Sequence, residues 1–194
     1  MGRPRSFDQA TTLDAIRDRF WETGYAATSI DDLMAATGLS KGSLYGAFGS
    51  KHAMYVRVLE DYSAAGLAGL RERLAGDDAG ALRRLKAYLR NYAKMAAQMC
   101  TQGCMMAKAT AELAGRDPDV DAIVARFLAD MEAAFTASIK QAQRAGDVPR
   151  TVDARQAALT LIAVHRGVES IGKMGASAAT LRSIVERALE ALTN

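Results

Sequence analysis

The stretch TSIDDLMAATGLSKGSLYGAFGSK, residues 28–51, decides the architecture of this chain because it predicts two short helices joined by a tight turn. Ser29 is a good N-cap and Asp32 follows three residues later, a capping-box-like pair that precedes apolar positions at helical spacing. These features predict a first helix over residues 30–36. Gly38 then supplies the left-handed conformation that a sharp turn between two helices needs.

The second helix of the pair, capped by Ser40, has one apolar face and one polar face. Leu44 and Phe48 lie four residues apart and are expected to point inward. The outward positions are small, polar and singly basic, which suits a helix that enters the major groove of DNA. Two short helices that meet at a glycine also occur in many all-α proteins, so the spacing alone leaves DNA binding and a purely structural role both open.

The composition favours a helical protein with a sizeable core. The chain has 194 residues, of which 49% are hydrophobic and only three are proline. We therefore expect an all-α fold. The pattern divides into a three-helix helix-turn-helix domain at residues 1–52 and a larger helical domain at residues 53–194, with a fourth helix that crosses from one to the other.

The net charge of +3 is no evidence for DNA binding, because residues 1–52 carry six basic and six acidic side chains. The distribution of the basic residues is more informative. Arg3 and Arg5 lie in a short N-terminal arm stiffened by proline, and Lys41 and Lys51 flank the second helix of the pair. Such an arm suits a phosphate strand or the minor groove of DNA, and a frayed, solvated terminus is the equal alternative.

Several classes of protein are disfavoured by what the sequence lacks. No segment has the roughly 18 consecutive apolar residues of a membrane span, and the first residues contain no apolar run like that of a signal peptide, so we expect a cytoplasmic protein. No phosphate-binding glycine loop, zinc motif or nucleophile motif is present, so we expect neither an enzyme nor a bound metal or cofactor. His165 lies on an apolar helix face and is interpreted as a core or interface histidine. The alternative from another class is a helical thiol enzyme that uses Cys104 with His165.

The helix-turn-helix stretch and its flanks closely resemble the DNA-binding domain of the TetR/AcrR family of transcriptional repressors. The resemblance covers residues 3–62 and is weak beyond them. It implies a one-component regulator, most simply a repressor, that binds double-stranded operator DNA and is released by a small-molecule effector bound in the second domain. The residues that carry it are Gly24-Tyr25, Thr28-Ser29, the run GLSKGSLY at 38–45, Phe48 and Ser50-Lys51.

The exposed face and the resemblance together predict the DNA contacts. Lys41 is expected to reach a base edge, and Lys51 to hold a phosphate at the start of the next helix, where the helix dipole also favours an anion. His52, which follows it, is interpreted as an exposed polar residue. The predicted DNA-binding residues are Arg3, Arg5, Thr28, Ser29, Ser40, Lys41, Gly42, Ser43, Tyr45, Gly46 and Lys51.

Methionine, cysteine and aromatic residues cluster in the middle of the second domain. Methionine lines adaptable apolar cavities, and the resemblance places a small-molecule pocket in this domain. An ordinary core is the alternative, and the sequence does not identify the effector. The residues predicted to line the pocket are Tyr88, Tyr92, Met95, Met99, Cys100, Cys104, Met105, Phe127 and Met131.

Cys100 and Cys104 lie four residues apart with Gly103 between them. If the helix breaks at Gly103, the pair could form a disulfide or one thiol could be modified. A thiol at the start of the helix that follows is in a position that favours the thiolate, so a repressor that senses oxidants or electrophiles through these cysteines is an alternative function. Inert packing is the other interpretation, since buried cysteine commonly behaves as a small hydrophobe.

Two helices are expected near the end of the chain, at residues 153–173 and 177–192. The resemblance implies that they pair with their copies in a second subunit, which gives a homodimer. The alternative is that both helices only close the core of their own subunit. The predicted interface residues are Leu161, Val168, Leu181, Val185 and Leu189.

Overall fold

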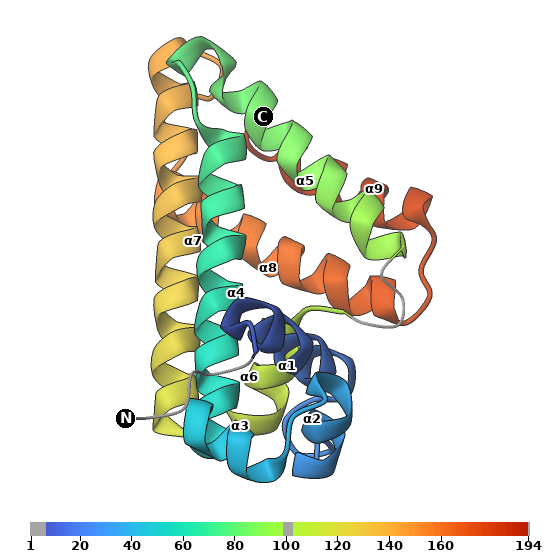
Figure 1. The fold of residues 1–194 in the computed structure, drawn as a ribbon. Coiled ribbons are helices and arrows are strands. Elements are labelled where there is room, and N and C mark those ends of the chain that lie inside the picture. The colour runs from blue at the N-terminus through green and yellow to red at the C-terminus, as the bar shows by residue number, and fades with distance from the viewer. Residues whose placement is uncertain (1–6, 99–102, 194) are drawn as a thin grey trace. The chain divides into compact units, whose positions relative to one another are not determined.

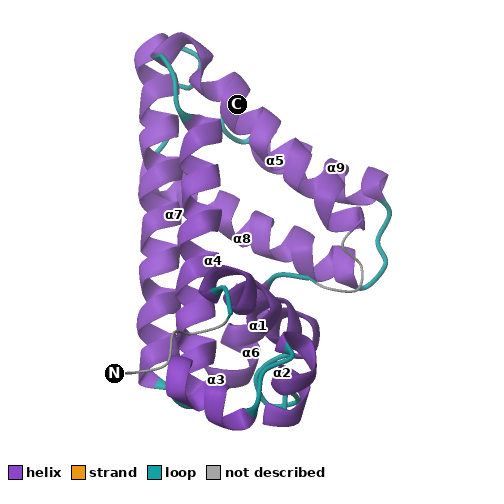
Figure 2. Ribbon diagram, in the orientation of Figure 1, coloured by secondary structure: helices purple, strands orange, loops and turns teal. Residues whose placement is uncertain are grey.

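The computed structural model describes residues 7–98 and 103–193, and the regular structure of these residues is entirely helical (Figure 1, Figure 2). The all-α prediction is therefore confirmed. The helices are α1 (Gln9–Thr23), α2 (Ile30–Thr37), α3 (Lys41–Phe48), α4 (Lys51–Leu74), the short 3-10 helix η1 (Asp78–Gly80), α5 (Ala81–Gln98), α6 (Met105–Leu113), α7 (Pro118–Ala145), α8 (Ala154–Lys173) and α9 (Ala178–Glu190).

The ends of these helices follow from capping residues in the sequence. The side chain of Asp8 accepts a hydrogen bond from the Thr11 amide at 2.7 Å and so begins α1. Ser177 begins α9 in the same way, through a 3.1 Å bond from the Thr180 amide. Each cap satisfies a backbone donor that the first turn of a helix leaves without a partner.

The chain divides into two compact units. The first comprises Met1–Ala64 and Cys104–Val124, and the second comprises Ala65–Gly103 and Ala125–Asn194. This division differs from the boundary expected after residue 52, because α4 contributes its first half to one core and its second half to the other. A continuous helical periodicity does not show where the packing partners of a helix change.

The core of the first unit is built on aromatic rings. Phe20 of α1 and Tyr55 of α4 are both buried, and their rings meet edge to face with centroids 5.0 Å apart. Leu33 of α2 and Leu44 of α3 are fully buried. The ring contact joins α1 to α4, and α2 packs against both α1 and α3.

In the second unit, α5, α8 and α9 pack against one another and share one hydrophobic core with parts of α4 and α7. Backbones approach closely at Gly172 of α8, where an added Cβ atom would lie 2.8 Å from the carbonyl oxygen of Ala96 in α5. An ion pair between Arg90 and Glu186, at 2.6 Å, also joins α5 to α9. The glycine is therefore part of the helix packing.

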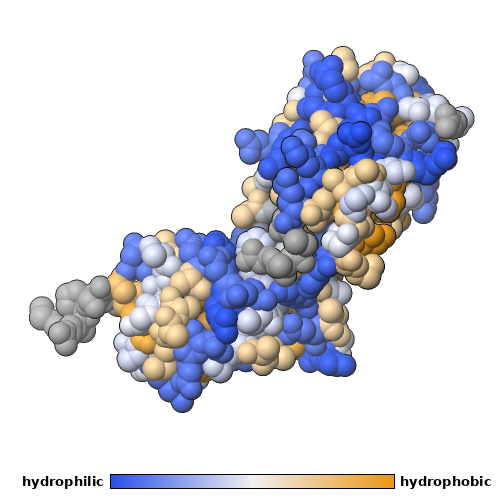
Figure 3. All heavy atoms as spheres, turned by 90° about the vertical axis from the view of Figure 1, so that its right-hand side faces the viewer, coloured by the Kyte–Doolittle hydropathy of each residue, from blue (hydrophilic) through white to orange (hydrophobic). Residues whose placement is uncertain are grey.

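Among the described residues, no helix is long and apolar enough to cross a membrane. The face drawn in Figure 3 carries mainly hydrophilic residues, broken by smaller hydrophobic areas.

Candidate nucleic-acid interface

The turn between α2 and α3 has the geometry that the sequence predicts. Ser29 Oγ accepts a hydrogen bond from the Asp32 amide at 3.1 Å, while Asp32 Oδ2 accepts one from the Ser29 amide at 2.8 Å, which completes a capping box. Gly38 adopts the left-handed conformation at φ 68° and ψ 11°, and its amide donates to the Met34 carbonyl at 2.9 Å. A left-handed glycine ends α2 and aims the chain into α3.

Asp32 also joins α2 to α1. Its Oδ1 atom lies 2.9 Å from Nη2 of Arg19. The Ser29 amide, more than this ion pair, lowers the pKa of the Asp32 carboxyl below its usual value. The carboxylate therefore holds the start of α2 in two ways.

The outward face of α3 is small, polar and exposed. Leu44 is fully buried, whereas the next residue, Tyr45, is 38% exposed. An added Cβ atom at Gly42 or at Gly46 would meet no atom within 4 Å. The chain's own packing therefore does not require either glycine. The other exposed residues of this face are Ser40, Lys41 and Ser43.

Two of the predicted DNA contacts, Lys51 and Thr28, differ in their surroundings. Lys51 begins α4, and its Nζ atom lies 4.4 Å from the centroid of the Tyr25 ring. Thr28 requires a correction, because it is only 1% exposed and its hydroxyl donates to the Gly24 carbonyl at 2.6 Å. The Thr28 side chain is therefore buried and hydrogen-bonded within the protein, and it does not reach the surface. Arg3 and Arg5 lie outside the described residues.

Helix α6 belongs to this first unit, which the sequence interpretation missed. The ammonium group of Lys108 in α6 donates to the backbone carbonyls of Trp21 and Glu22 at the end of α1, the second at 2.8 Å. A carboxylate oxygen of Glu112 accepts from the Ala26 amide at 3.0 Å. A cation at the C-terminus of a helix is favoured by the free carbonyls and the helix dipole. Helix α6 therefore supports α1 and the segment that leads to α2.

The residues predicted to line one effector pocket are divided between the two units. Cys104 and Met105 belong to the first unit, where Met105 is buried. Met95, in the second unit, is 45% exposed. Helical spacing predicts on which face of its helix a residue lies, but it does not show which other helices pack against that face. Of the others, Met99 and Cys100 lie outside the described residues, and the second unit contains Tyr88, Tyr92, Phe127 and Met131.

Tyr88 and Tyr92 instead meet a buried histidine in the second unit. His165 of α8 is 6% exposed, its Nε2 atom lies 3.3 Å from the Tyr88 hydroxyl, and its ring stacks on Tyr92 with centroids 3.5 Å apart. Burial, and to a smaller extent the charge of Arg166, lowers the pKa of His165 to about 3, so its imidazole is neutral near pH 7. Among the described residues, its Nδ1 atom has no hydrogen-bond partner. Glu169 extends this group by accepting a hydrogen bond from the Tyr92 hydroxyl at 3.2 Å.

The predicted dimer-interface residues also require a correction. All five are at most 1% exposed in the single chain, where they belong to the hydrophobic core of the second unit. A side chain already buried in its own subunit has no surface left for a partner. The apolar stripes of α8 and α9 face α5, and the residues in question are Leu161, Val168, Leu181, Val185 and Leu189.

Two family models match the chain. The model described as "Bacterial regulatory proteins, tetR family" matches residues 13–58, and the model described as "Tetracyclin repressor-like, C-terminal domain" matches residues 81–191. The HTH-type transcriptional repressor ComR of Escherichia coli (strain K12) is 28% identical over 184 residues, which are 94% of this chain and 88% of ComR. The HTH-type transcriptional repressor DhaR of Mycobacterium sp. (strain GP1) is 27% identical over 148 residues, which are 76% of this chain and 73% of DhaR.

Solved structures are similar over nearly the whole chain. A cysteine mutant of the TetR family transcriptional regulator CifR, complexed with 26bp double-strand operator DNA, matches with a TM-score of 0.83 and 26% identity over 98% of this chain and 100% of that chain. The reduced form of E. coli NemR shares the fold, with a TM-score of 0.78 and 22% identity over 94% of each chain. On this evidence the chain belongs to the TetR family of transcriptional regulators.

Proposed function

We propose that this regulator is a repressor that binds double-stranded operator DNA as a homodimer through α3, and that a small-molecule effector bound in the second unit releases it. The observation that carries the proposal is the exposed face of α3. Glycine in a helix is less favourable than alanine by about 1 kcal/mol, and neither Gly42 nor Gly46 has a packing reason inside the chain. A face kept small at this energetic cost suits the close approach of a helix backbone to a DNA groove.

The residues of the first unit then take distinct roles. Lys41, at the first position of α3, is placed to reach a base edge in the major groove. Ser29, Tyr45 and Lys51 are placed to hold phosphates on either side, and the backbone amides at the start of α4 add to the contact at Lys51. The basic arm with Arg3 and Arg5 remains a predicted minor-groove contact.

The family supports the proposed homodimer. Two symmetric reading heads bind two half-sites related by a two-fold axis. Because the apolar stripes of α8 and α9 are used inside the subunit, we place the interface on the outer surfaces of these helices, where Leu159 of α8 is 37% exposed. We expect such a DNA-binding regulator to work in the cytoplasm and to have no catalytic turnover.

The effector site is proposed at the group formed by Tyr88, Tyr92 and His165 between α5 and α8. An unpaired polar atom in a protein interior costs about 1–3 kcal/mol, and Nδ1 of His165 is such an atom among the described residues. A compact planar molecule that stacks beside the tyrosines and offers a hydrogen-bonding group to Nδ1 would remove this cost. Binding of this molecule can change DNA affinity only if it favours one arrangement of the dimer's two DNA-binding domains over another.

A thiol-sensing repressor is the second candidate. Cys104 occupies the N-cap position of α6, and it is half-buried rather than enclosed, so a reagent can reach it. Mass-spectrometric alkylation of the native protein compared with the urea-unfolded protein decides this candidate. A Cys104 that reacts only after unfolding is a packing residue, and the sensing proposal then fails.

Selection of bound sequences from random double-stranded DNA tests the proposed function as a whole. The account predicts enrichment of an inverted repeat, with half-sites spaced by about one helical turn. A second selection with candidate effectors present should lose this enrichment for the compound that the protein senses. If repeated rounds enrich no sequence, the protein is not a sequence-specific repressor.

A further inference from the structure

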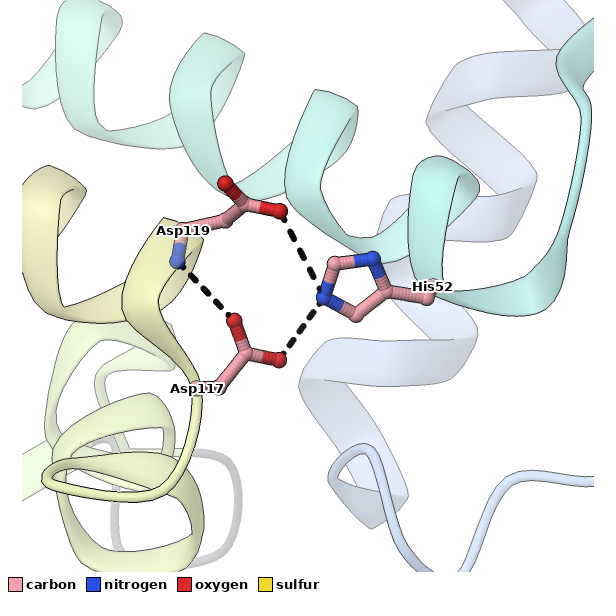
Figure 4. A group of neighbouring side chains, drawn as sticks. All are labelled: His52, Asp117 and Asp119. Carbon is pink, nitrogen blue, oxygen red and sulfur yellow. Dashed lines mark hydrogen bonds and ion pairs between the residues drawn. The ribbon is translucent and has the colours of Figure 1, made fainter.

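Three side chains with metal-ligating atoms converge in the first unit (Figure 4). His52 lies in the first turn of α4, Asp117 immediately precedes α7, and Asp119 lies in the first turn of α7. The Nε2 atom of His52 lies 2.7 Å from Oδ2 of Asp117 and 4.0 Å from Oδ2 of Asp119. One donor atom from each residue lies within 4.8 Å of the other two. The group thus offers one imidazole nitrogen and two carboxylate oxygens at a single point.

These separations fit a small divalent ion. Zinc binds histidine nitrogen at about 2.0–2.1 Å and carboxylate oxygen at about 2.0–2.2 Å, usually in a tetrahedron. Two donors at these distances and at a tetrahedral angle are about 3.4 Å apart. The measured separations of 2.7 and 4.0 Å lie on either side of this value. Side-chain movements of less than about 1 Å would bring all three donors into range.

Backbone contacts already orient one of the ligands. Oδ1 of Asp117 accepts hydrogen bonds from the amides of Asp119 and Val120, at 3.1 and 3.2 Å, which leaves Oδ2 directed at His52. A ligand whose second oxygen is fixed by the protein loses little freedom when it binds a metal. The Asp117 side chain is 14% exposed and that of Asp119 is 66% exposed. The cluster is therefore closed on one side and open to water on the other, which leaves room for a fourth ligand.

We propose that His52, Asp117 and Asp119 bind one divalent transition-metal ion, with zinc as the best-fitting example. Mixed nitrogen and oxygen donors suit first-row transition metals, whereas magnesium and calcium prefer oxygen donors alone. The two carboxylates carry two negative charges, which a divalent ion neutralises. In the absence of the ion, the same residues form the hydrogen bond between His52 and Asp117.

The position of the metal site suggests an effect on DNA binding by the first unit, and this inference rests on the proposed function. His52 directly follows Lys51, the predicted phosphate contact, and Asp117 follows α6, which holds the end of α1 through Lys108. An ion that joins the start of α4 to the start of α7 would restrict both segments. We therefore expect metal occupancy to stabilise the first unit and to change the affinity for DNA.

The test measures metal binding by the full-length protein without DNA, so that its outcome does not depend on the DNA proposal. Protein freed of metal with a chelator is titrated with zinc by calorimetry, with magnesium as the comparison ion. We expect one zinc ion per chain and no measurable magnesium binding. His52→Gln and Asp119→Asn should each weaken zinc binding by at least about tenfold.

Two control variants separate this site from other zinc-binding groups. Asp61→Asn changes an exposed carboxylate of the same helix α4 that pairs with Arg57, and it should leave zinc binding unchanged. Cys104→Ser should also leave it unchanged, which excludes a thiol ligand. Thermal unfolding in chelator shows whether each variant is folded, and Asp119→Asn is the safest variant because its side chain is largely exposed.

Absence of zinc binding at millimolar concentration would overturn the proposal. Equal affinity in the wild type and in folded Asp119→Asn and His52→Gln proteins would overturn it as well. If the protein binds zinc as predicted but its DNA affinity does not change, the metal site is supported and only its effect on DNA binding is wrong.

Discussion

Gly42 and Gly46 lie on the exposed face of α3 with open space where a side chain would project. Replacing Gly46 with alanine should raise the free energy of unfolding by about 0.5–1 kcal/mol, because alanine favours the helix. The added methyl group should nevertheless weaken DNA binding by separating the helix from the groove. Urea unfolding and fluorescence anisotropy with a labelled duplex measure the two effects.

Gly167 of α8 provides the matched control for this prediction. It is also a helical glycine with no atom within 4 Å of an added Cβ atom, but it lies in the second unit. Gly167→Ala should therefore gain similar stability without a change in DNA affinity, and sedimentation must show unchanged self-association because Gly167 lies on α8, where we place the dimer interface. If Gly46→Ala binds DNA as tightly as Gly167→Ala does, the glycine face is not the DNA-binding surface.

His165 predicts a pH dependence of stability through its lowered pKa. The pKa is 6.5 in the unfolded chain and about 3 in the folded protein, so between these values only the unfolded state binds the proton. The free energy of unfolding must then fall as the pH decreases from 6.5 towards 3, by about 2 kcal/mol at pH 5 from this residue alone. His165→Gln keeps a hydrogen-bonding side chain that does not titrate. Urea unfolding at pH 7 and pH 5 should show a smaller loss for this variant, and an equal loss would show that His165 is protonated in the folded protein.

At the scale of the helices, Gly172 and Gly167 of α8 make opposite predictions for the same substitution. An alanine Cβ atom at Gly172 would lie 2.8 Å from the Ala96 carbonyl oxygen and 3.2 Å from a methyl group of Leu181. Gly172→Ala should therefore lower the free energy of unfolding by about 1–3 kcal/mol, because α5 and α8 must move apart. Gly167→Ala should raise it, as stated above. Urea denaturation of both variants checks the difference in sign, and a stable Gly172→Ala protein would contradict the close packing of α5 and α8.

The elements were predictable from the sequence because their signals are local. The cap at Ser29, the left-handed Gly38 and the inward Leu44 all depend on neighbours within about four residues, and each appears in the structure as expected. The family resemblance added the role of α3. The DNA-contact residues remain predictions.

The predictions that failed depended on partners distant in sequence. The hydroxyl of Thr28 donates a hydrogen bond to the Gly24 carbonyl. Met105 belongs to the first unit, and Leu189 is buried in the hydrophobic core of its own subunit. A helical stripe shows which face of a helix is apolar but not which element covers that face. The same reason explains why the contact of Lys108 with the end of α1 was not predicted from the sequence.

At the scale of the whole molecule, the proposed homodimer predicts the effect of a charge on the outer surface of α8. Leu159→Glu should weaken self-association by at least about tenfold, because a carboxylate buried without a partner is unfavourable. Leu128→Glu is the matched control, since Leu128 of α7 is 39% exposed and Leu159 is 37% exposed. Sedimentation equilibrium measures both variants. A wild type that is monomeric at micromolar concentration would contradict the dimer, and equal weakening by both variants would contradict its placement on α8.

The central claim is that α3 reads DNA sequence while the start of α4 holds the backbone. Affinities of Lys41→Ala and Lys51→Ala for a selected duplex and for mutated duplexes, measured over a range of salt concentrations, test this claim most directly. Lys41→Ala should lose about 1–3 kcal/mol of discrimination at one base position of each half-site. Lys51→Ala should weaken binding to all duplexes alike and reduce the salt slope by about one per subunit. If both variants keep the affinity, sequence preference and salt slope of the wild type, the assignment of α3 and α4 as the DNA-binding surface is wrong.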